Sequence, residues 1–281
     1  MSSDELLPAY SQQFQPASLR ELTSTGPIAG ITPEWAWGDS TGHGVRVAVV
    51  DSGIEYDHPA VGEAVQAGVI VEYDEQAEDQ VRIIADDQPK DMSGHGTACA
   101  GIIHSIAPEA ELYSVRVLGS DMRGRAIQFA TGLEWAVENK MHVANLSLST
   151  SRQEYYGMFH ELADSAYFKN VVLVSAVNNI PAPSYPSLYS SVVSVAAHTG
   201  HDPLKYYYNP SPPVEFGAPG IDVRVAWKDH QYLISTGNSF AAPHITGIVA
   251  LIRAKHPELT PFQIKTVLWA CAANVRRQEA S

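Results

Sequence analysis

Apolar strands alternate with helices along most of this chain, and this alternation constrains its fold more than any other feature. The expected strands are short apolar runs, such as VRVAVVD at 45–51 and VVLVSAV at 171–177. Helices are expected between them, for example RAIQFATGLEWAVEN at 125–139. Strands joined in this way form a parallel sheet whose two faces are both covered by helices. The expected fold class is therefore α/β, with three layers around a mainly parallel central sheet.

The remaining elements follow from the same patterns. The other expected strands are 111–118, 142–149 and 191–197, and the other helices are 94–106, 154–168, 240–256 and 260–275. An acidic turn, DEQAED, separates two apolar runs at 69–73 and 81–85, which predicts a β-hairpin. Thr260, Pro261 and Gln263 give the last helix a capping box with proline at its first position. Residues 1–25 are polar and aperiodic, so we expect an N-terminal arm followed by one domain over residues 26–281.

The charge balance limits the classes of partner. The chain has 18 basic and 31 acidic residues, a net charge of −13, which argues against nucleic acid and against an anionic membrane. No segment reaches the run of about 18 apolar residues that spans a membrane. The N-terminus lacks the basic and apolar regions of a signal peptide. Both cysteines, Cys99 and Cys271, are expected to be thiols, as a reducing compartment would allow, so we expect a cytoplasmic protein.

Three polar residues stand at the ends of apolar elements. Asp51 ends the first strand, His95 lies between glycines at a helix start, and Ser239 opens a nearly all-apolar helix. Each has a simpler interpretation on its own, as a turn cap, a structural histidine and a helix N-cap. Together they supply the nucleophile, base and orienting carboxylate that hydroxyl attack on a carbonyl requires. A nucleotide-binding α/β protein is the competing class, but no glycine-rich phosphate loop follows the first strand.

On these residues the chain resembles the subtilisin-like serine proteases, or subtilases, over roughly residues 27–275. VAVVDSGIEYDHP resembles the aspartate block of that family, SGHGTACAGII its histidine block, and STGNSFAAPHITGIVALI its serine block. The pattern HGTxCAG is similar to the proteinase K-like branch. The order Asp, His, Ser is that of the subtilisin type. The resemblance implies a serine endopeptidase in which Ser239 attacks, His95 is the base and Asp51 orients the imidazole, through an acyl-enzyme.

The resemblance also implies an oxyanion hole and a specificity pocket. Asn179, in VVLVSAVNNIP, matches the family's amide that stabilises the tetrahedral intermediate, together with the main-chain N–H of Ser239. The simpler interpretation of Asn179 is a loop residue. Asn238 stands where the family usually has threonine, and its amide is a second candidate donor. Asn178 replaces a glycine beside the pocket, so with Ala176 and Val177 we expect a narrow or polar but uncharged pocket.

We expect a peptide or protein substrate to bind as an extended strand, read largely through its backbone. The resemblance places this strand between the segment of Ser147, Leu148 and Ser149 and the segment around Gly124. Cys99 follows His95 by four residues, which puts its thiol one helical turn away, beneath the imidazole. We therefore predict that a mercurial inhibits the enzyme by displacing His95. A small buried apolar residue is the alternative interpretation of Cys99, and the two are compatible.

No metal and no cofactor are expected. The segment HSI is too short for the calcium-binding loop of many secreted relatives, and Ala60 replaces an aspartate that often follows the HP of the first block. The acidic hairpin at 72–91 is expected to be a solvated face, with a weak cation site or an attraction for basic substrate residues as alternatives. The expected function is limited processing of a peptide or protein precursor. The alternative is a catalytically impaired pseudo-protease that binds peptides, and the chain also fits one domain of a larger protein.

Overall fold

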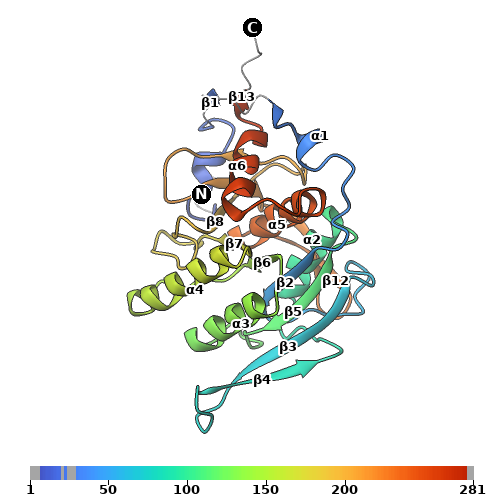
Figure 1. Cartoon of the computed structure of the whole chain (residues 1–281), viewed down its shortest axis with the longest axis vertical. Coiled ribbons are helices and arrows are strands. Elements are labelled where there is room, and N and C mark those ends of the chain that lie inside the picture. The colour runs from blue at the N-terminus through green and yellow to red at the C-terminus, as the bar shows by residue number, and fades with distance from the viewer. Residues whose placement is uncertain (1–6, 20–21, 24–29, 277–281) are drawn as a thin grey trace.

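A nine-stranded sheet runs through the middle of the structure, a computed structural model that describes residues 7–19, 22–23 and 30–276 (Figure 1). The strand order is β4-β3-β5-β2-β6-β7-β8-β10-β9. The strands are β2 (Arg46–Asp51), β3 (Val65–Tyr73), β4 (Val81–Asp86), β5 (Glu111–Arg116), β6 (Val143–Leu146), β7 (Val172–Ala176), β8 (Val193–His198), β9 (Tyr207–Tyr208) and β10 (Phe216–Pro219). Within this sheet the pairs β3–β4 and β10–β9 are antiparallel, and the other neighbours run parallel. The predicted fold class and the predicted hairpin are thereby confirmed.

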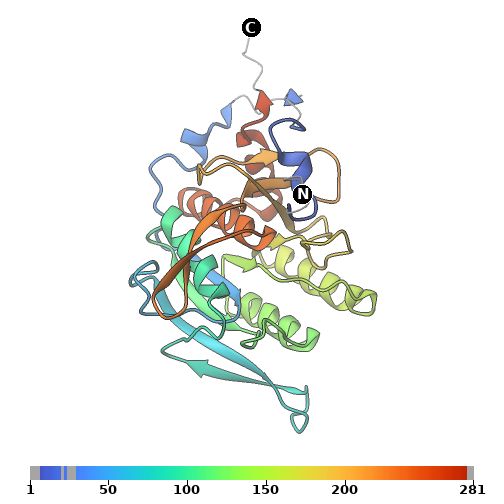
Figure 2. The same cartoon turned by 180° about the vertical axis from the view of Figure 1, so that it is seen from behind.

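Helices cover both faces of the sheet (Figures 1 and 2). One face carries α2 (His95–Ile106) and α5 (Asn238–Lys255), with α6 (Pro261–Cys271) packed on α5. The other face carries α3 (Ala126–Glu138) and α4 (Tyr156–Phe168). The central residues of β2 are all apolar because both faces of the strand are buried. Val47 and Val49 pack into the core on the side of α2 and α5, and Ala48 and Val50 pack into the core on the side of α3 and α4.

Helix α5 is buried along almost its whole length, because it lies between the sheet and α2. This position explains the apolar composition of its sequence on every side. The predicted capping box of α6 is present: the Thr260 side chain accepts from the Gln263 N–H, and the Gln263 side chain accepts from the Thr260 N–H. No helix in the described ranges combines the length and apolarity needed to cross a membrane.

Several short elements were not predicted from the sequence. They are η2 (Ser11–Phe14), β1 (Leu22–Thr23), α1 (Pro33–Ala36), η4 (Gln153–Tyr155), β9, β10, β11 (Val223–Trp227), β12 (Gln231–Ser235) and β13 (Val275–Arg276). Strands β11 and β12 form a separate antiparallel hairpin whose chain continues directly into α5. Two neighbouring residues at its turn, Asp229 and His230, have positive φ, and no glycine marks the turn in the sequence.

The N-terminal segment packs onto the domain where the structure describes it. The expected boundary between residues 25 and 26 lies outside the described residues. Phe14 is 1% exposed and packs with Val177, Ala196 and Val214. Residues 7–19 are therefore part of the folded unit, although their sequence is polar and aperiodic.

The topology brings several strand ends to one edge of the sheet. Strands β2, β6 and β7 are parallel neighbours, so their carboxyl ends meet there. Asp51 is the last residue of β2, Ser147 follows β6, and Ala176 ends β7. Ligands of parallel sheets bind at such carboxyl ends. This edge therefore holds the predicted site residues.

Candidate active site

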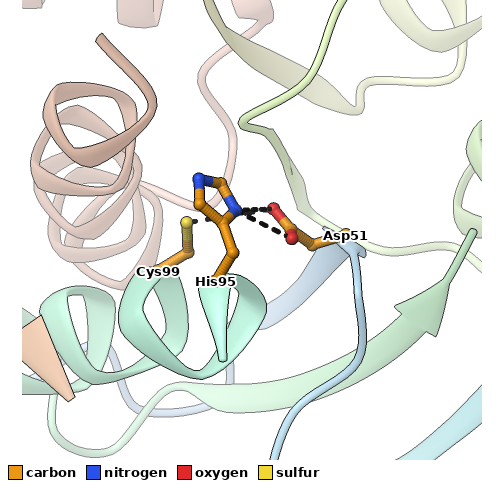
Figure 3. Close-up of side chains that lie close together, drawn as sticks. All are labelled: Asp51, His95 and Cys99. Carbon is orange, nitrogen blue, oxygen red and sulfur yellow. Dashed lines mark hydrogen bonds and ion pairs between the residues drawn. The ribbon is translucent and has the colours of Figure 1, made fainter. Parts of the chain in front are cut away.

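Asp51 is fully buried at the end of β2 and is held by two partners. Its Oδ1 accepts from the Ser52 N–H at 2.7 Å. Both carboxylate oxygens lie 2.9 Å from Nδ1 of His95 (Figure 3). The second ring nitrogen of His95 points away from the carboxylate (Figure 3). Because Nδ1 donates to Asp51, the neutral imidazole has its lone pair on Nε2, where a base needs it.

The glycines on either side of His95 are required by close packing. Gly94 caps α2 with φ of 106°, and a Cβ there would lie 2.6 Å from the Trp227 ring. A Cβ on Gly96 would collide with the carbonyl oxygen of Gly53, in the turn that follows Asp51. Gly94 therefore lets the start of α2 pass close to the Trp227 ring of β11, and Gly96 lets it lie directly against the turn after β2. This contact is what places the imidazole beside the carboxylate.

Asp91 fixes the start of α2, a role that the sequence analysis did not assign. Its Oδ1 accepts from the N–H groups of Ser93 and Gly94 at 3.0 and 2.8 Å. Its Oδ2 accepts from both the N–H and the hydroxyl of Thr97 at 2.7 Å. The expectation that the acidic residues at 72–91 form a solvated face is wrong for Asp91. Its carboxylate satisfies helix N–H groups that would otherwise lack partners.

Opposing effects set the pKa of His95. Burial, the largest single effect, disfavours the charged imidazolium and lowers the pKa. The charge of Asp51, its hydrogen bond to Nδ1 and the more distant charge of Asp91 all favour the imidazolium. The net result is a pKa raised above the ordinary histidine value of 6.5.

Ser239 lies in the first turn of α5 and does not cap that helix. The helix begins at Asn238, and Gly237 is the N-cap residue. Pro243, four residues after Ser239, has no N–H to donate to the Ser239 carbonyl. The hydroxyl of Ser147 donates to that carbonyl instead, at 2.8 Å, and the thiol of Cys99 lies 3.6 Å from it. The backbone of Ser239 is thereby tied to the segment after β6 and to α2.

Two buried polar residues, Asn145 and Thr246, support this contact, and neither was predicted from the sequence. Thr246 donates to Oδ1 of Asn145 at 2.9 Å, and Nδ2 of Asn145 donates to the Ser147 hydroxyl at 3.0 Å. The available signal was Asn145 itself, which stands inside the apolar strand β6 and is fully buried. A buried amide needs partners.

One cavity of about 1000 Å³ is lined by His95, Ser239 and the predicted substrate-binding residues, while Asp51 lies buried behind His95. Its walls include His95, Asn179, Ser239, Ser147, Leu148, Ser149, Gly124, Ala176, Val177 and Asn178. The far wall comes from the hairpin and includes Tyr73, Glu78, Asp79 and Gln80. Two acidic residues of the hairpin thus face the cavity. The segment 122–126 and the segment 147–150 both line the cavity.

Asn178 and Asn179 follow β7 and both line the cavity. The Oδ1 of Asn178 accepts from the Ile180 N–H at 3.2 Å, and its own N–H donates to the hydroxyl of Ser184 at 3.0 Å. The backbone at Asn178 has no positive φ, so asparagine fits where the family usually has glycine. The Oδ1 of Asn179 accepts from the Asn238 N–H at 2.9 Å. Because that partner is a donor, the bonded atom is the oxygen, and Nδ2 is the free end of the amide.

Asn238 does not fit its predicted role as an oxyanion donor. Its side chain is fully buried, and its Nδ2 donates to the carbonyls of Ala9, Val177 and Asn178 at 3.1, 3.3 and 3.1 Å. Its Oδ1 accepts from the Ala197 N–H at 2.9 Å. The amide is therefore fully used by main-chain groups behind the cavity. The prediction is corrected: in place of donating to the oxyanion, Asn238 binds the segments around it.

Cys99 lies one turn after His95, in contact with the site. Its Sγ is 3.9 Å from Oδ2 of Asp51, and the residue is fully buried (Figure 3). Burial and then the charge of Asp51 raise the pKa of the thiol well above its ordinary value. The protonated thiol is therefore the stable form. Inhibition by mercury stays a prediction.

Two groups of side chains in the described part of the chain have the spacing of metal ligands. Asp51, His95 and Cys99 form the first group, and they already contact one another. Glu55, Asp57 and His230 form the second, near the surface. The carboxylate of Glu55 already accepts from the N–H groups of Asp229 and His230.

A buried aspartate–histidine pair in a three-layer α/β fold, on a cavity that also holds a serine, defines a class of serine hydrolase. Comparison with known sequences narrows this class. The profile of the subtilase family, peptidase S8, matches residues 42–281. The chain therefore belongs to the subtilase family of serine proteases.

Individual relatives agree with this assignment. The chain is 34% identical over 239 residues to subtilisin BL from Lederbergia lenta, covering 81% of this chain and 83% of that protein. It is 33% identical over 236 residues to the thermostable alkaline protease of Halalkalibacterium halodurans, covering 80% and 61%. A solved cold adapted subtilisin-like serine proteinase has a TM-score of 0.64 at 25% identity, covering 82% of each chain. The S41 psychrophilic protease has a TM-score of 0.67 at 26% identity, covering 84% and 87%.

The pH profile of kcat/KM tests the Asp51–His95 pair. Activity should fall in acid, because a protonated imidazole cannot accept a proton, and the midpoint should lie above 6.5. Asp51→Asn removes the two largest effects that raise the pKa of His95. The midpoint should then move to lower pH, and kcat should drop by about 10⁴-fold. Equal midpoints for the two proteins, measured with a chromogenic peptide, would contradict this account of the pair.

Proposed function

We propose that this protein is an active endopeptidase in which Ser239 is the nucleophile. The observation that carries the proposal is the hydrogen-bonded Asp51–His95 pair on a cavity shared with Ser239 and Asn179. The tautomer of His95 leaves Nε2 able to accept a proton. The free end of the Asn179 amide supplies a donor on the same cavity.

The proposed reaction has two halves. As Oγ of Ser239 bonds to the substrate carbonyl carbon, its proton passes to Nε2 of His95, and the carbonyl oxygen becomes an oxyanion. Nδ2 of Asn179 and the N–H of Ser239 stabilise that oxyanion. The C–N bond then breaks, and His95 returns the proton to the leaving amine. Water attacks the acyl-enzyme in the same way, which releases the acid and regenerates Ser239.

We also propose that the enzyme processes selected peptides or precursors within the cytoplasm. The substrate would lie as an extended strand between the segment of Ser147, Leu148 and Ser149 and the segment around Gly124, which line one cavity. The hairpin residues Glu78 and Asp79 add acidic groups to the far wall. A long cavity wall favours recognition of several substrate residues. Both cysteines are buried thiols and are not joined in a disulfide, which is compatible with a reducing compartment.

A fluorophosphonate probe tests the nucleophile. The wild-type protein should be labelled at Ser239, because the probe requires a serine activated by a base. Ser239→Ala should abolish the labelling, and Ser235→Ala, in the preceding strand, should leave it unchanged. A correctly folded wild-type protein that is not labelled would favour a peptide-binding pseudo-protease.

Cleavage of a peptide library tests the proposed selectivity. We expect cleavage to be confined to a subset of sequences, with preferences at several positions along the extended substrate. Casein should be cut slowly and at few sites. Rapid digestion of casein at many unrelated sites would contradict limited processing.

A further inference from the structure

The N-terminal segment docks directly behind the oxyanion asparagine. The N–H of Ala9 donates to the main-chain carbonyl of Asn179 at 2.8 Å. The carbonyl of Ala9 accepts from Nδ2 of Asn238 at 3.1 Å. Phe14, five residues later, holds the segment in the hydrophobic cluster that also contains Val177. Ala9 thus links Asn238, which precedes Ser239, to Asn179, which faces the oxyanion.

The side chain of Asn238 connects two further segments at the same point. Its Oδ1 binds β8 through the Ala197 N–H, and its Nδ2 binds the end of β7 through the carbonyls of Val177 and Asn178. The side chain has no exposed surface, so water cannot replace a lost partner. Removal of the amide would leave buried main-chain groups unpaired, which is costly.

Asn179 is consequently held at both its main chain and its side chain. Ala9 binds its carbonyl, and the Asn238 N–H binds its Oδ1. Because the side-chain amide of Asn179 is planar, a hydrogen bond that holds its Oδ1 also fixes the direction in which its Nδ2 points. Because an oxyanion donor has to be oriented before the charge develops, the contacts that orient it contribute to the rate of the chemical step.

We propose that docking of the N-terminal segment through Ala9 sets the oxyanion hole, and that Asn238 is the positioning residue that links the two. This inference rests on the proposed function, because it assigns a role to residues that support Asn179. Neither Ala9 nor Asn238 touches the reacting atoms. Their effect is to hold the Nδ2 group of Asn179 where the oxyanion forms. A chain in which the segment is undocked then has lower activity, although its triad is intact.

Two truncated proteins test the role of Ala9. One begins at Leu7 and keeps every contact described above. The other begins at Ser11, so that the initiator methionine occupies position 10 and nothing replaces Ala9, while Phe14 is retained. We expect kcat of the shorter chain to fall by about 10- to 100-fold relative to the longer one, less than the 10²–10³ for complete loss of a donor. KM should change by less than about twofold, because the interaction lost acts in the transition state.

Asn238→Thr tests the link in the full-length chain. Threonine is the usual residue of the family at this position, so folding should be preserved, and the N–H to Asn179 remains. The side-chain amide is lost, and kcat should fall by about tenfold with little change in KM. The pH midpoint of kcat/KM should not move, because the Asp51–His95 pair is untouched. Val137→Ala, a change in the core between α3 and the sheet, is the control: it should lower thermal stability and leave kcat unchanged.

The outcomes separate this inference from the proposed function. A wild-type chain that neither hydrolyses peptides nor reacts with a fluorophosphonate would overturn both. An active wild type, together with a Ser11 chain and an Asn238→Thr variant that keep its full kcat, would overturn this inference alone. If the Ser11 chain fails to fold, the Asn238→Thr result decides. A loss of kcat with a shifted pH midpoint would also count against it, because it would locate the damage in the triad.

Discussion

Asp51 has no contact with water, and the rest of the site follows from the need to pair its charge. A carboxylate buried at the end of a parallel strand is stable only with donors around it. Ser52 and His95 are those donors. To bring His95 there, α2 begins against the turn after β2, which requires glycine at position 96. Asp91 then accepts from N–H groups at the start of that helix that have no partner within the helix. The pairing also leaves Nε2 of His95 available as a base.

Ser239, the proposed nucleophile, is placed by a second constraint, which comes from Pro243. Proline in the first turns of α5 leaves the Ser239 carbonyl without its helical partner. The hydroxyl of Ser147 takes that place, and Asn145 and Thr246 support it from within the core. The chain thus ties α5 to the end of β6, the neighbour of β2. These hydrogen bonds, together with the packing of α5 between the sheet and α2, bring the serine to the edge where Asp51 and His95 lie.

Sequence patterns predicted strands β2 to β8 of the central sheet and the main helices, because each depends on a local signal, but they did not predict β9 or β10. The resemblance to the subtilases added several of the residues that line the cavity. Apolar periodicity marks the strands, and three short blocks mark Asp51, His95 and Ser239. The partners of Asn238 gave no such signal. They are main-chain atoms of Ala9, Ala197 and Asn178, far apart in sequence, so the inward direction of its amide could not be predicted. Asp91 was predicted to be solvated because it follows a run of acidic residues. The sequence alone does not distinguish a carboxylate that accepts from helix N–H groups from one that is exposed to solvent.

A crystal structure of the protein with a peptidyl boronic acid tests directly whether Ser239 and Asn179 act together. We expect a bond from boron to Oγ of Ser239, with one boronate oxygen about 3 Å from Nδ2 of Asn179 and from the Ser239 N–H. The peptide part should pair with the backbone near Ser147 and Gly124. A boronate that bonds elsewhere, or whose oxygen points away from Asn179, would show that the two residues do not form this site.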